Sequence, residues 1–355
     1  MNAESVPAVQ REDEKLFSVL HHFPDHCIAE KWQAFLSDSD YPSHYAAPEF
    51  FLEPAIRDKN PFAVLSVVDG EVTAVLTGIN DAGHIQSGLS VRPQIAISHR
   101  ADPAQGMANL MSGLLAEARS ARLIDVFEWS KPAKPIDSRF RQKSYEGVVM
   151  LDLSLGPEAL FRRFSENKRT NIKKAIKHGV SVEPAKSLDD ISAYYTICVD
   201  WCRRKALPIP PRDQFQQTFA LTNNRVLFLA RHEGHIIAGV VIRFFPHGVM
   251  EYAANSSLES ALRLRPNDLL HWRAIEWGCG EGMTKYNLGG AHLFLRKFGG
   301  EIVPTIRYRL DMSLLRRYAL LDWITEKVEV IRPCVPEQVL SLARALHRRI
   351  EGLQS

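Results

Sequence analysis

Three neighbouring side chains near the middle of the sequence, Lys168, Arg169 and Asn171, have the chemistry to bind an anion. They lie in the basic segment 161–179, which has a proline just before it and a glycine at its end, as is typical of a helix. On a helical wheel Lys168 falls inside the apolar stripe, and Arg169 and Asn171 lie at its edges. Ser165 could also cap a second helix within the segment.

Lys168 is unusual because a lysine on the buried face of a helix is costly. It must reach solvent, find a counter-charge or line a polar cavity. Lys173 points away from the apolar stripe, where charges are ordinary solvated surface. We therefore expect Lys168→Ala to lower activity or ligand affinity with little loss of folding, and Lys173→Ala to change almost nothing.

Composition limits the class of protein. The 355 residues suffice for two domains, and 45% hydrophobic with 24% charged residues is ordinary for a globular chain. A net charge of +3 is too small to imply nucleic-acid binding over the whole surface, so DNA is not expected as a partner. The five cysteines are scattered and favour free thiols in a reducing compartment.

No stretch of the sequence approaches the ~20 apolar residues of a membrane span, and the polar N-terminus does not resemble a secretory signal. The sequence therefore predicts a cytoplasmic protein, with residues 1–15 disordered. No metal site is expected, because the histidines near the N-terminus fit a turn better than a ligand set.

An internal repeat organises the elements that position these residues. Two β-hairpins are predicted around Gly70 and Gly234, which are 164 residues apart (234 − 70), and the helix-opening Pro103 and Pro266 are 163 apart (266 − 103). The predicted elements are 63–68, 72–79, 94–98, 103–119 and 123–129 in the first copy, and 226–231, 236–245, 250–254, 266–282 and 286–288 in the second. The same order at one spacing indicates a duplication.

The duplication predicts two domains, at 16–150 and 151–312, followed by a C-terminal helical extension at 313–355. The basic helix opens the second domain. Two helices are predicted in the extension, at 314–328 and 336–350. The first carries leucines and arginines that could rest on a membrane surface, although packing against the second domain is the favoured interpretation.

Four stretches of the second half resemble a known family. They are 167–175 followed by Gly179, the hairpin through Gly239, 265–270, and 286–290 with 297–300. In this order they resemble the FemAB-like branch of the GNAT acyltransferase superfamily, which includes the aminoacyl transferases of peptidoglycan cross-bridges and related acyltransferases of polysaccharide synthesis. The resemblance implies an α/β (α+β) fold of two tandem GNAT-like domains, each a mixed twisted sheet flanked by helices.

One position departs from the family pattern. Family members often carry Phe-Lys-x-x-Phe-Gly near the end of this region, with the lysine near the reacting carbonyl. Here Phe294 and Phe298 match, but Leu295 stands at the lysine position. Lys297 or Arg296 could substitute from a shifted backbone, or the role could be absent. The departure favours a broader acyl transfer over aminoacyl transfer to peptidoglycan.

The resemblance also suggests where a donor would bind. In this fold the turn before the central helix presents backbone N–H groups to the donor's phosphates. In the second copy this turn is 262–267, which offers Arg265 and Asn267, although it could be only a basic surface loop. Gly289 and Gly290 would let the backbone approach a ligand closely, with a plain tight turn as the alternative.

The implied reaction is attack by an amine or hydroxyl on an activated carbonyl, with acyl-CoA or aminoacyl-tRNA as co-substrate and no tightly bound cofactor. Glu251 and Tyr252 are the candidates for handling the proton. Strand alternation sends them to opposite faces, so at most one of them faces the site. The alternative is that they form a cross-strand pair and a core aromatic.

We therefore expect an N- or O-acyltransferase that acts on a small-molecule or lipid-linked sugar or another cell-envelope precursor. The alternative is a non-catalytic tandem-GNAT protein that binds a nucleotide-linked sugar or RNA, since Leu295 replaces the lysine and the donor turns are poor in glycine. The sequence leaves open the choice of donor, the domain that binds it and the oligomeric state.

Overall fold

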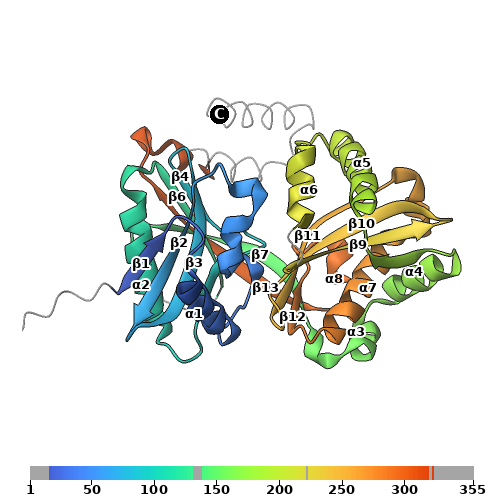
Figure 1. Cartoon of the computed structure of the whole chain (residues 1–355), viewed down its shortest axis with the longest axis horizontal. Coiled ribbons are helices and arrows are strands. Elements are labelled where there is room, and N and C mark those ends of the chain that lie inside the picture. Colours follow the sequence, from blue (N-terminus) through green and yellow to red (C-terminus); the bar gives the residue numbers. More distant parts are fainter. Residues whose placement is uncertain (1–15, 131–137, 221–222, 320–321, 324–355) are drawn as a thin grey trace, which may run out of the picture.

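The chain forms two α/β halves that lie side by side and share one β-sheet (Figure 1). The computed structural model describes residues 16–130, 138–220, 223–319 and 322–323. The predictions of disorder at 1–15 and of a helix at 336–350 concern residues outside these ranges, as do residues 320–321 and 324–328 of the helix predicted at 314–328.

Hydrogen bonds join the strands in the order β1-β2-β3-β4-β6-β13-β7-β12-β11-β10-β9-β8, and β5 pairs with β3 beside this path. The strands are β1 Phe17–Leu20, β2 Pro61–Val68, β3 Glu71–Asp81, β4 His84–Ser87, β5 Ile95–Ile97, β6 Leu123–Trp129, β7 Arg141–Asp152, β8 Ser181–Pro184, β9 Arg225–His232, β10 His235–Phe244, β11 Val249–Ser257, β12 Lys285–Asn287 and β13 Glu301–Asp311. Two pairs are parallel, β4 with β6 and β11 with β12, so the sheet is mixed as predicted.

Two long strands carry the sheet from one half to the other. β13 pairs with β7 along its length, and its residues 305–311 also pair with β6 of the first half. β7 pairs in turn with β12 of the second half. The mixed sheets predicted for the two domains are therefore joined into one continuous sheet, because strands from late in the chain complete the sheet of the first half. The predicted boundary at 150/151 falls inside β7.

Helices cover both faces of the sheet (Figure 1). They are α1 His26–Ser37, α2 Pro103–Glu117, α3 Pro157–Arg163, α4 Glu166–Lys177, α5 Leu188–Lys205, α6 Arg212–Ala220, α7 Pro266–Gly280 and α8 Leu293–Arg296. In the first half α2 packs on one face of β2 and β3, and α1 packs on the other. In the second half α4 and α7 cover one face, and α5 and α6 cover the opposite face.

The two halves repeat the same irregularities. The β2–β3 hairpin skips Thr73 in its register, and the β9–β10 hairpin skips Ile237, again 164 residues later (237 − 73). The strand that matches β11 in the first half is β4, because each runs parallel to the strand that follows the helix. The third strand predicted near 94–98 is β5, a short strand that pairs with β3. The hairpin bulges thus support the duplication.

The basic segment is two helices. α3 ends at Arg163, and α4 begins after Ser165, whose side chain accepts a hydrogen bond from the backbone N–H of Lys168. Ser165 thus caps a second helix within the segment, as the sequence allowed.

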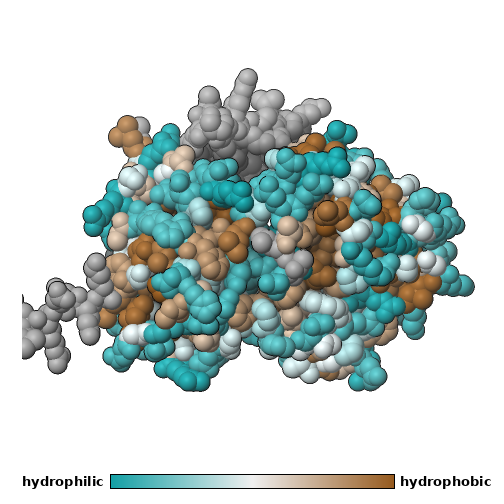
Figure 2. Space-filling model, viewed as in Figure 1, coloured by the Kyte–Doolittle hydropathy of each residue, from teal (hydrophilic) through white to brown (hydrophobic). Residues whose placement is uncertain are grey.

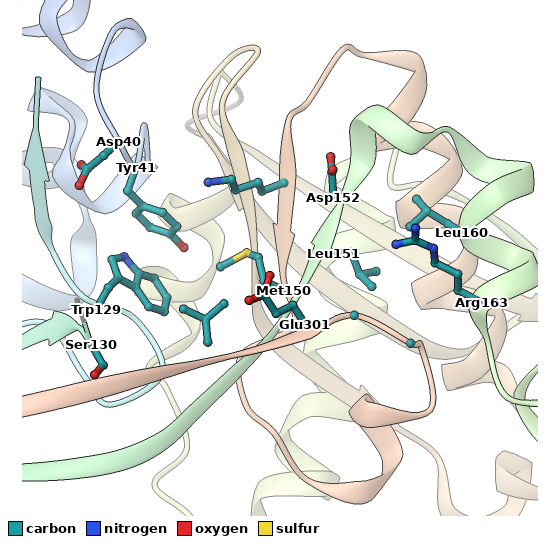
Figure 3. A pocket seen from close by; sticks show the side chains of 14 residues that line it. Asp40, Tyr41, Trp129, Ser130, Met150, Leu151, Asp152, Leu160, Arg163 and Glu301 are labelled. Carbon is teal, nitrogen blue, oxygen red and sulfur yellow. The ribbon is translucent and has the colours of Figure 1, made fainter. Parts of the chain in front are cut away.

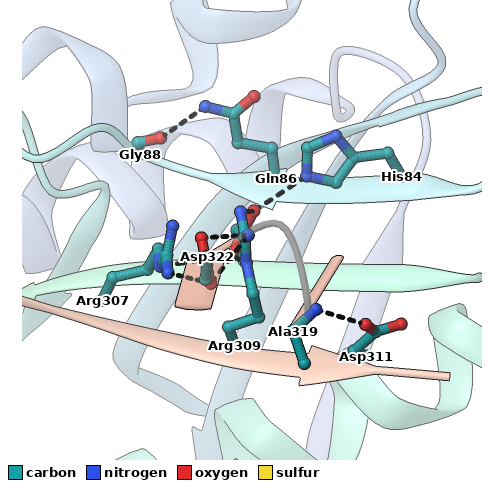
Figure 4. Close-up of polar contacts among 9 residues, drawn as sticks. His84, Gln86, Gly88, Arg307, Arg309, Asp311, Ala319 and Asp322 are labelled. Carbon is teal, nitrogen blue, oxygen red and sulfur yellow. Dashed lines mark hydrogen bonds and ion pairs between the residues drawn. The ribbon is translucent and has the colours of Figure 1, made fainter. Parts of the chain in front are cut away.

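The described start of the C-terminal extension is tied to β13. Asp322 accepts hydrogen bonds from Arg307 (2.6 Å) and Arg309 (3.0 Å) (Figure 4). Arg309 also pairs with Asp125 of β6. Burial alone would raise the pKa of Asp125, but hydrogen bonds from His84 and Arg309 lower it. The extension is therefore anchored at the seam where β13 meets the first half.

Hydrophilic and hydrophobic residues are interspersed on the face seen in Figure 2. Within the part of the chain that the structure describes, no helix has the length and apolar character needed to cross a membrane.

The close approach of β7 and β13 requires a residue without a side chain at position 147, where the chain has Gly147. Its backbone has φ +78°, and a Cβ there would overlap the carbonyl oxygen of Val303 in β13. Gly234 has nearly the same φ, +79°, but no atom lies within 4 Å of the place that its Cβ would take. Both alanine variants bear the cost of positive φ, and only Gly147→Ala adds a backbone overlap. We expect Gly147→Ala to lower the free energy of unfolding by about 1–3 kcal/mol more than Gly234→Ala in urea denaturation. Equal losses would contradict this account of the crossing.

Candidate functional site

Lys168 is buried, as its place on the inward face of the basic segment predicted. Only 1% of the residue is exposed, and its Nζ lies 2.5 Å from Oδ1 of Asp268 in the first turn of α7. The ammonium group also lies 3.4 Å from the centre of the Phe294 ring and 4.1 Å from that of Phe298. Of the three possibilities open to a buried lysine, a counter-charge is the one the fold supplies.

Burial lowers the pKa of Lys168, Asp268 opposes that change, and the nearby charge of Lys297 adds to the lowering. The ion pair therefore does two things. It joins α4 to α7, and it places a fixed charge among aromatic rings under the sheet.

His271 lies in the same buried layer, one turn further along α7. Its Nδ1 is 3.0 Å from the hydroxyl of Tyr286 on β12. Burial, followed by the charges of Lys168 and His292, lowers the pKa of His271 to about 3. The imidazole is therefore neutral at pH 7.

Tyr252 borders this layer on the same face of the sheet. Its ring centre is 5.2 Å from that of His271, and burial raises the pKa of its hydroxyl to about 12. Gly289, at φ +71°, packs so closely that a Cβ there would lie 2.7 Å from Cδ1 of Tyr252. Gly290 uses its carbonyl to accept a hydrogen bond from Val149 of β7. These contacts account for both glycines as parts of a tight turn.

Glu251 lies on the opposite face and contacts the first half of the chain. Its carboxylate accepts hydrogen bonds from Ser43 (2.6 Å) and Tyr41 (3.0 Å). Only 1% of the residue is exposed. Burial raises the pKa of Glu251, although hydrogen bonds from Ser43 and Tyr41 and the charge of Arg92 act against it. The strand alternation expected for Glu251 and Tyr252 thus places one at the junction of the halves and the other in the core.

The backbone of β11 changes course directly after Glu251. Pairing with β12 covers three residues and stops at Glu251 and Asn287, whereas β11 continues to Ser257 beside β10. The register with β10 skips Ala253, which makes a β-bulge at this point. A bulge leaves backbone groups outside the regular ladder and re-aims the neighbouring side chains, and such bulges are frequent next to active sites.

A buried charge network lies beside Glu251 on the same face. Glu53 of the first half accepts hydrogen bonds from Arg225 (2.8 Å) and Arg243 (3.0 Å) of the second, and it also contacts His44 (2.7 Å). Burial lowers the pKa of His44 to about 4, so His44 is neutral at pH 7. Arg243 is the cross-strand partner of Glu251, which brings the network and the carboxylate together.

Between the halves this face opens into a cavity of about 470 Å³, hereafter the inter-half cavity. It is lined by Tyr45, Phe50, Glu53, Ala55, Ile56, Ile79, Gln86, Gly88, Leu89, Arg92, Gln94, Cys198, Pro210, Phe215, Thr218, Phe219, Val241, Arg243, Ala253 and Ala254. The bulged Ala253 thus lies on its wall. The cavity is large enough for a small organic molecule and combines apolar walls with a few charged groups, as ligand sites do.

A second cavity of about 470 Å³ includes Lys285, at the start of β12, in its wall (Figure 3). Tyr41 and Trp129 of the first half face Met150 and Glu301 of β7 and β13 across it. The ring of Tyr41 lines this cavity while its hydroxyl reaches Glu251, so one side chain connects the two regions.

Other predicted site residues are more dispersed. Arg169 donates hydrogen bonds to the carbonyls of Arg162 and Phe164, so it caps the end of α3. Asn171 is half-buried, and Arg265 and Lys297 are exposed. Asn267 accepts a hydrogen bond from Asn255 of β11 (3.2 Å), which places it at the start of α7 beside the bulged strand.

Leu295, at the position of the family lysine, is 2% exposed and belongs to the core of the second half. Lys297, two residues later, is exposed at the end of α8, and its charge helps to lower the pKa of Lys168.

The sequence reasoning missed the residues that the first half contributes, Tyr41, Ser43 and Arg92, and it also missed Arg243 and Asp268. One signal was available. Arg243 is a charged residue within an otherwise apolar strand, the same anomaly that drew attention to Lys168. Tyr41 and Ser43 carried no such signal, because their role depends on contacts with residues 208 or more positions away.

The Lys168–Asp268 pair changes the expectation for Lys168→Ala. Removing the ammonium leaves a buried carboxylate without its partner, which costs about 3–5 kcal/mol of folding stability. We therefore expect a large loss in urea denaturation, little change for the exposed Lys173→Ala, and recovery of much of the loss in the double variant Lys168→Met/Asp268→Leu. A stable Lys168→Ala protein would show that the ion pair does not support the fold.

The buried histidines predict a dependence of stability on pH. Their pKa values, about 4 for His44 and about 3 for His271, lie below the ordinary 6.5, so the unfolded chain binds protons more readily. Their contribution is complete above pH 6.5 and is lost as the pH falls toward 4. Between pH 6.5 and pH 5 each histidine should lower the free energy of unfolding by about 2 kcal/mol.

His271→Gln should therefore lose less stability between pH 7 and 5 than the parent protein, as measured by urea midpoints. The exposed His22→Gln serves as the control and should follow the parent curve. Identical curves for all three proteins would show that His271 is not buried in neutral form.

Comparison with known proteins supports the arrangement described here. Residues 162–296 match the sequence profile of the acetyltransferase (GNAT) domain. No curated protein sequence matches the chain.

Among solved structures, FemX superposes with a TM-score of 0.60 at 12% identity, covering 86% of this chain and 99% of FemX. The C-terminal domain of a putative lysylphosphatidylglycerol synthetase from Agrobacterium fabrum gives 0.56 at 14% identity, with 83% and 95% covered. A tandem GNAT protein from the clavulanic acid biosynthesis pathway gives 0.50 at 11% identity, with 84% and 98% covered. The chain thus has the tandem GNAT fold and resembles the FemAB-like branch, as its sequence motifs predicted.

Proposed function

We propose that this protein is an acyltransferase that moves an acyl group from acyl-CoA to an amine or hydroxyl of a sugar or cell-envelope precursor held between its two halves. The observation that carries the proposal is the end of β11–β12 pairing at Glu251. Directly after it, the Ala253 bulge opens on the inter-half cavity.

The end of the pairing between β11 and β12 suits an acyl donor, because β11 continues beyond the last residue of β12. An extended chain could lie along the free side of β11, with its anionic end near the start of α7. Helix N-termini favour anions, and Arg265 adds an exposed positive charge there. No side chain caps this helix start. Asn267, beside the bulged strand, is the side chain best placed to contact such a donor.

The position of Leu295 favours a thioester donor over aminoacyl-tRNA. The resemblance places a lysine there near the reacting carbonyl, but here the side chain is packed into the core. The matching profile of an acetyltransferase domain points the same way. The names of two structural neighbours, FemX and the lysylphosphatidylglycerol synthetase domain, support an acceptor from the cell envelope. A cytoplasmic location is part of this proposal, because the proposed CoA thioester donors are available there.

Two effects would lower the barrier. Holding acceptor and donor on either side of the bulge makes their reaction effectively unimolecular, and backbone N–H groups of the bulge could stabilise the oxyanion. Glu251 is the proposed proton acceptor, because a carboxyl group whose pKa is raised by burial removes a proton from an amine or hydroxyl more readily. The hydroxyls of Ser43 and Tyr41 form its contact with the junction between the halves.

The proton role predicts the behaviour of Glu251→Gln. The amide keeps the shape and can still hydrogen-bond Ser43 and Tyr41, but it accepts no proton. We expect kcat to fall about 10²–10⁴-fold, with loss of the acidic limb of the pH–rate profile, while the melting temperature stays close to that of the parent. Tyr252→Phe, on the opposite face, should keep its rate and profile. A Glu251→Gln enzyme with normal kcat would make Glu251 a structural link only.

The donor is tested by thermal shift and by transfer assays. Acetyl-CoA should raise the melting temperature and release free thiol in the presence of an amino-sugar acceptor, whereas charged tRNA should do neither. Stabilisation by charged tRNA with aminoacyl transfer would replace the proposed donor. Binding of a nucleotide-linked sugar without any acyl transfer would favour the non-catalytic alternative.

A further inference from the structure

The inter-half cavity carries a feature that the proposed reaction does not use. Two arginines line its wall, Arg92 from the first half and Arg243 from β10 of the second. Neither has its donors fully engaged among the described residues. Nε of Arg92 and both Nε and Nη1 of Arg243 are buried without a hydrogen-bond partner.

Arg243 is the more constrained of the two. The residue is 8% exposed, and only its Nη2 is satisfied, by Glu53 at 3.0 Å. Leaving charged donors buried and unpaired costs free energy, and native structures rarely tolerate it without a reason. Arg92 is held differently, with its guanidinium carbon 3.7 Å above the centre of the Tyr45 ring. That stacking fixes the plane of the fork while leaving its N–H groups available.

The charges around the cavity do not balance. Glu53 is shared by Arg225 and Arg243, so two buried guanidinium groups face one carboxylate. His44 is neutral at pH 7, and Arg92 adds a third positive charge at the wall. Glu251 supplies a second negative charge nearby, where it accepts hydrogen bonds from Ser43 and Tyr41. The local excess is positive.

Much of the rest of the wall is apolar, although Gln86, Gln94 and Thr218 also line it. Phe215 and Phe219 of α6 and Ile79 and Leu89 of the first half contribute to the apolar part. A ligand that fills this space must therefore combine an apolar body with a compact anionic group. A carboxylate or a phosphate fits a pair of arginine forks, whereas a neutral group leaves their donors unpaired.

We propose that the inter-half cavity is an anion-binding subsite in which Arg92 and Arg243 hold a carboxylate or phosphate of the molecule that enters, next to the Ala253 bulge. That this molecule is the acyl acceptor rests on the proposed function. The subsite itself does not, because it can be tested by binding alone.

The test uses the full chain and three probes of similar size in isothermal titration calorimetry: 3-phenylpropionate, phenyl phosphate and the neutral 3-phenylpropionamide. The protein should bind at least one of the two anions and bind the amide about tenfold or more weakly. Tighter binding of one anion identifies the group as carboxylate or phosphate.

Arg92→Gln and Arg243→Gln should each lower the affinity for the anion by about tenfold or more, without changing the weak binding of the amide. Arg243→Lys serves as a second variant, because it keeps the charge beside Glu53 and loses only the fork. Arg273→Gln is the matched control. Arg273 is an arginine of α7 that pairs with Glu276, and its substitution should leave all affinities unchanged.

Equal affinity for the anions and the amide, or anion binding that survives both the Arg92 and the Arg243 substitutions, would overturn the subsite. Anion binding that depends on both arginines in a protein without transferase activity would keep the subsite and remove the proposed function. Transferase activity that is indifferent to both arginines would keep the proposed function and overturn the assignment of the bound anion as the acyl acceptor.

Discussion

The sheet continues without a break through β13 and β7, and the relation between the two halves depends on this pairing. A strand edge with free N–H and C=O groups must be paired or covered. β6 of the first half finds its partner in β13, which comes from the end of the second half, and β12 finds its partner in β7. The halves are thus joined by backbone hydrogen bonds, and Gly147 permits the two strands to pass closely because it has no side chain.

This joining brings the first half against one face of β10 and β11. Glu251 meets Tyr41 and Ser43 there, and Arg225 and Arg243 meet Glu53. Neither half alone provides all the partners of these groups. In an isolated second half, Arg225 and Arg243 would lose the carboxylate of Glu53. The charged residues of β10 and β11 are therefore compatible with burial only in the joined fold. The inter-half cavity has the same dependence, because its walls come from both copies.

The other face of the second half follows a different logic. Lys168, Asp268 and His271 lie beneath the sheet within one copy, surrounded by Phe294 and Phe298. The ammonium group of Lys168 pairs with the carboxylate of Asp268, so the charges of this layer are paired within one copy. The two faces of β11 thus differ in kind. One is a closed polar core that supports α4 and α7, and the other leaves arginine donors available at a cavity.

Much of the fold could be predicted because it depends on local patterns. The turn glycines, the helix-opening prolines and the alternation along the strands set the repeated hairpin, helix and strand. The inward position of Lys168 followed from helical periodicity, and the opposite faces of Glu251 and Tyr252 followed from strand alternation.

Only the tertiary structure decided what those side chains meet. Lys168 finds Asp268 100 residues later, and Glu251 finds Tyr41 210 residues earlier. The pairing of β13 with β6 of the first half could not be predicted from the sequence either, because the apolar alternation of a strand does not specify its partner. A local pattern determines which face a residue occupies. The long-range pairing of strands determines which charges share that face, and the assignment of the anion subsite depends on that pairing.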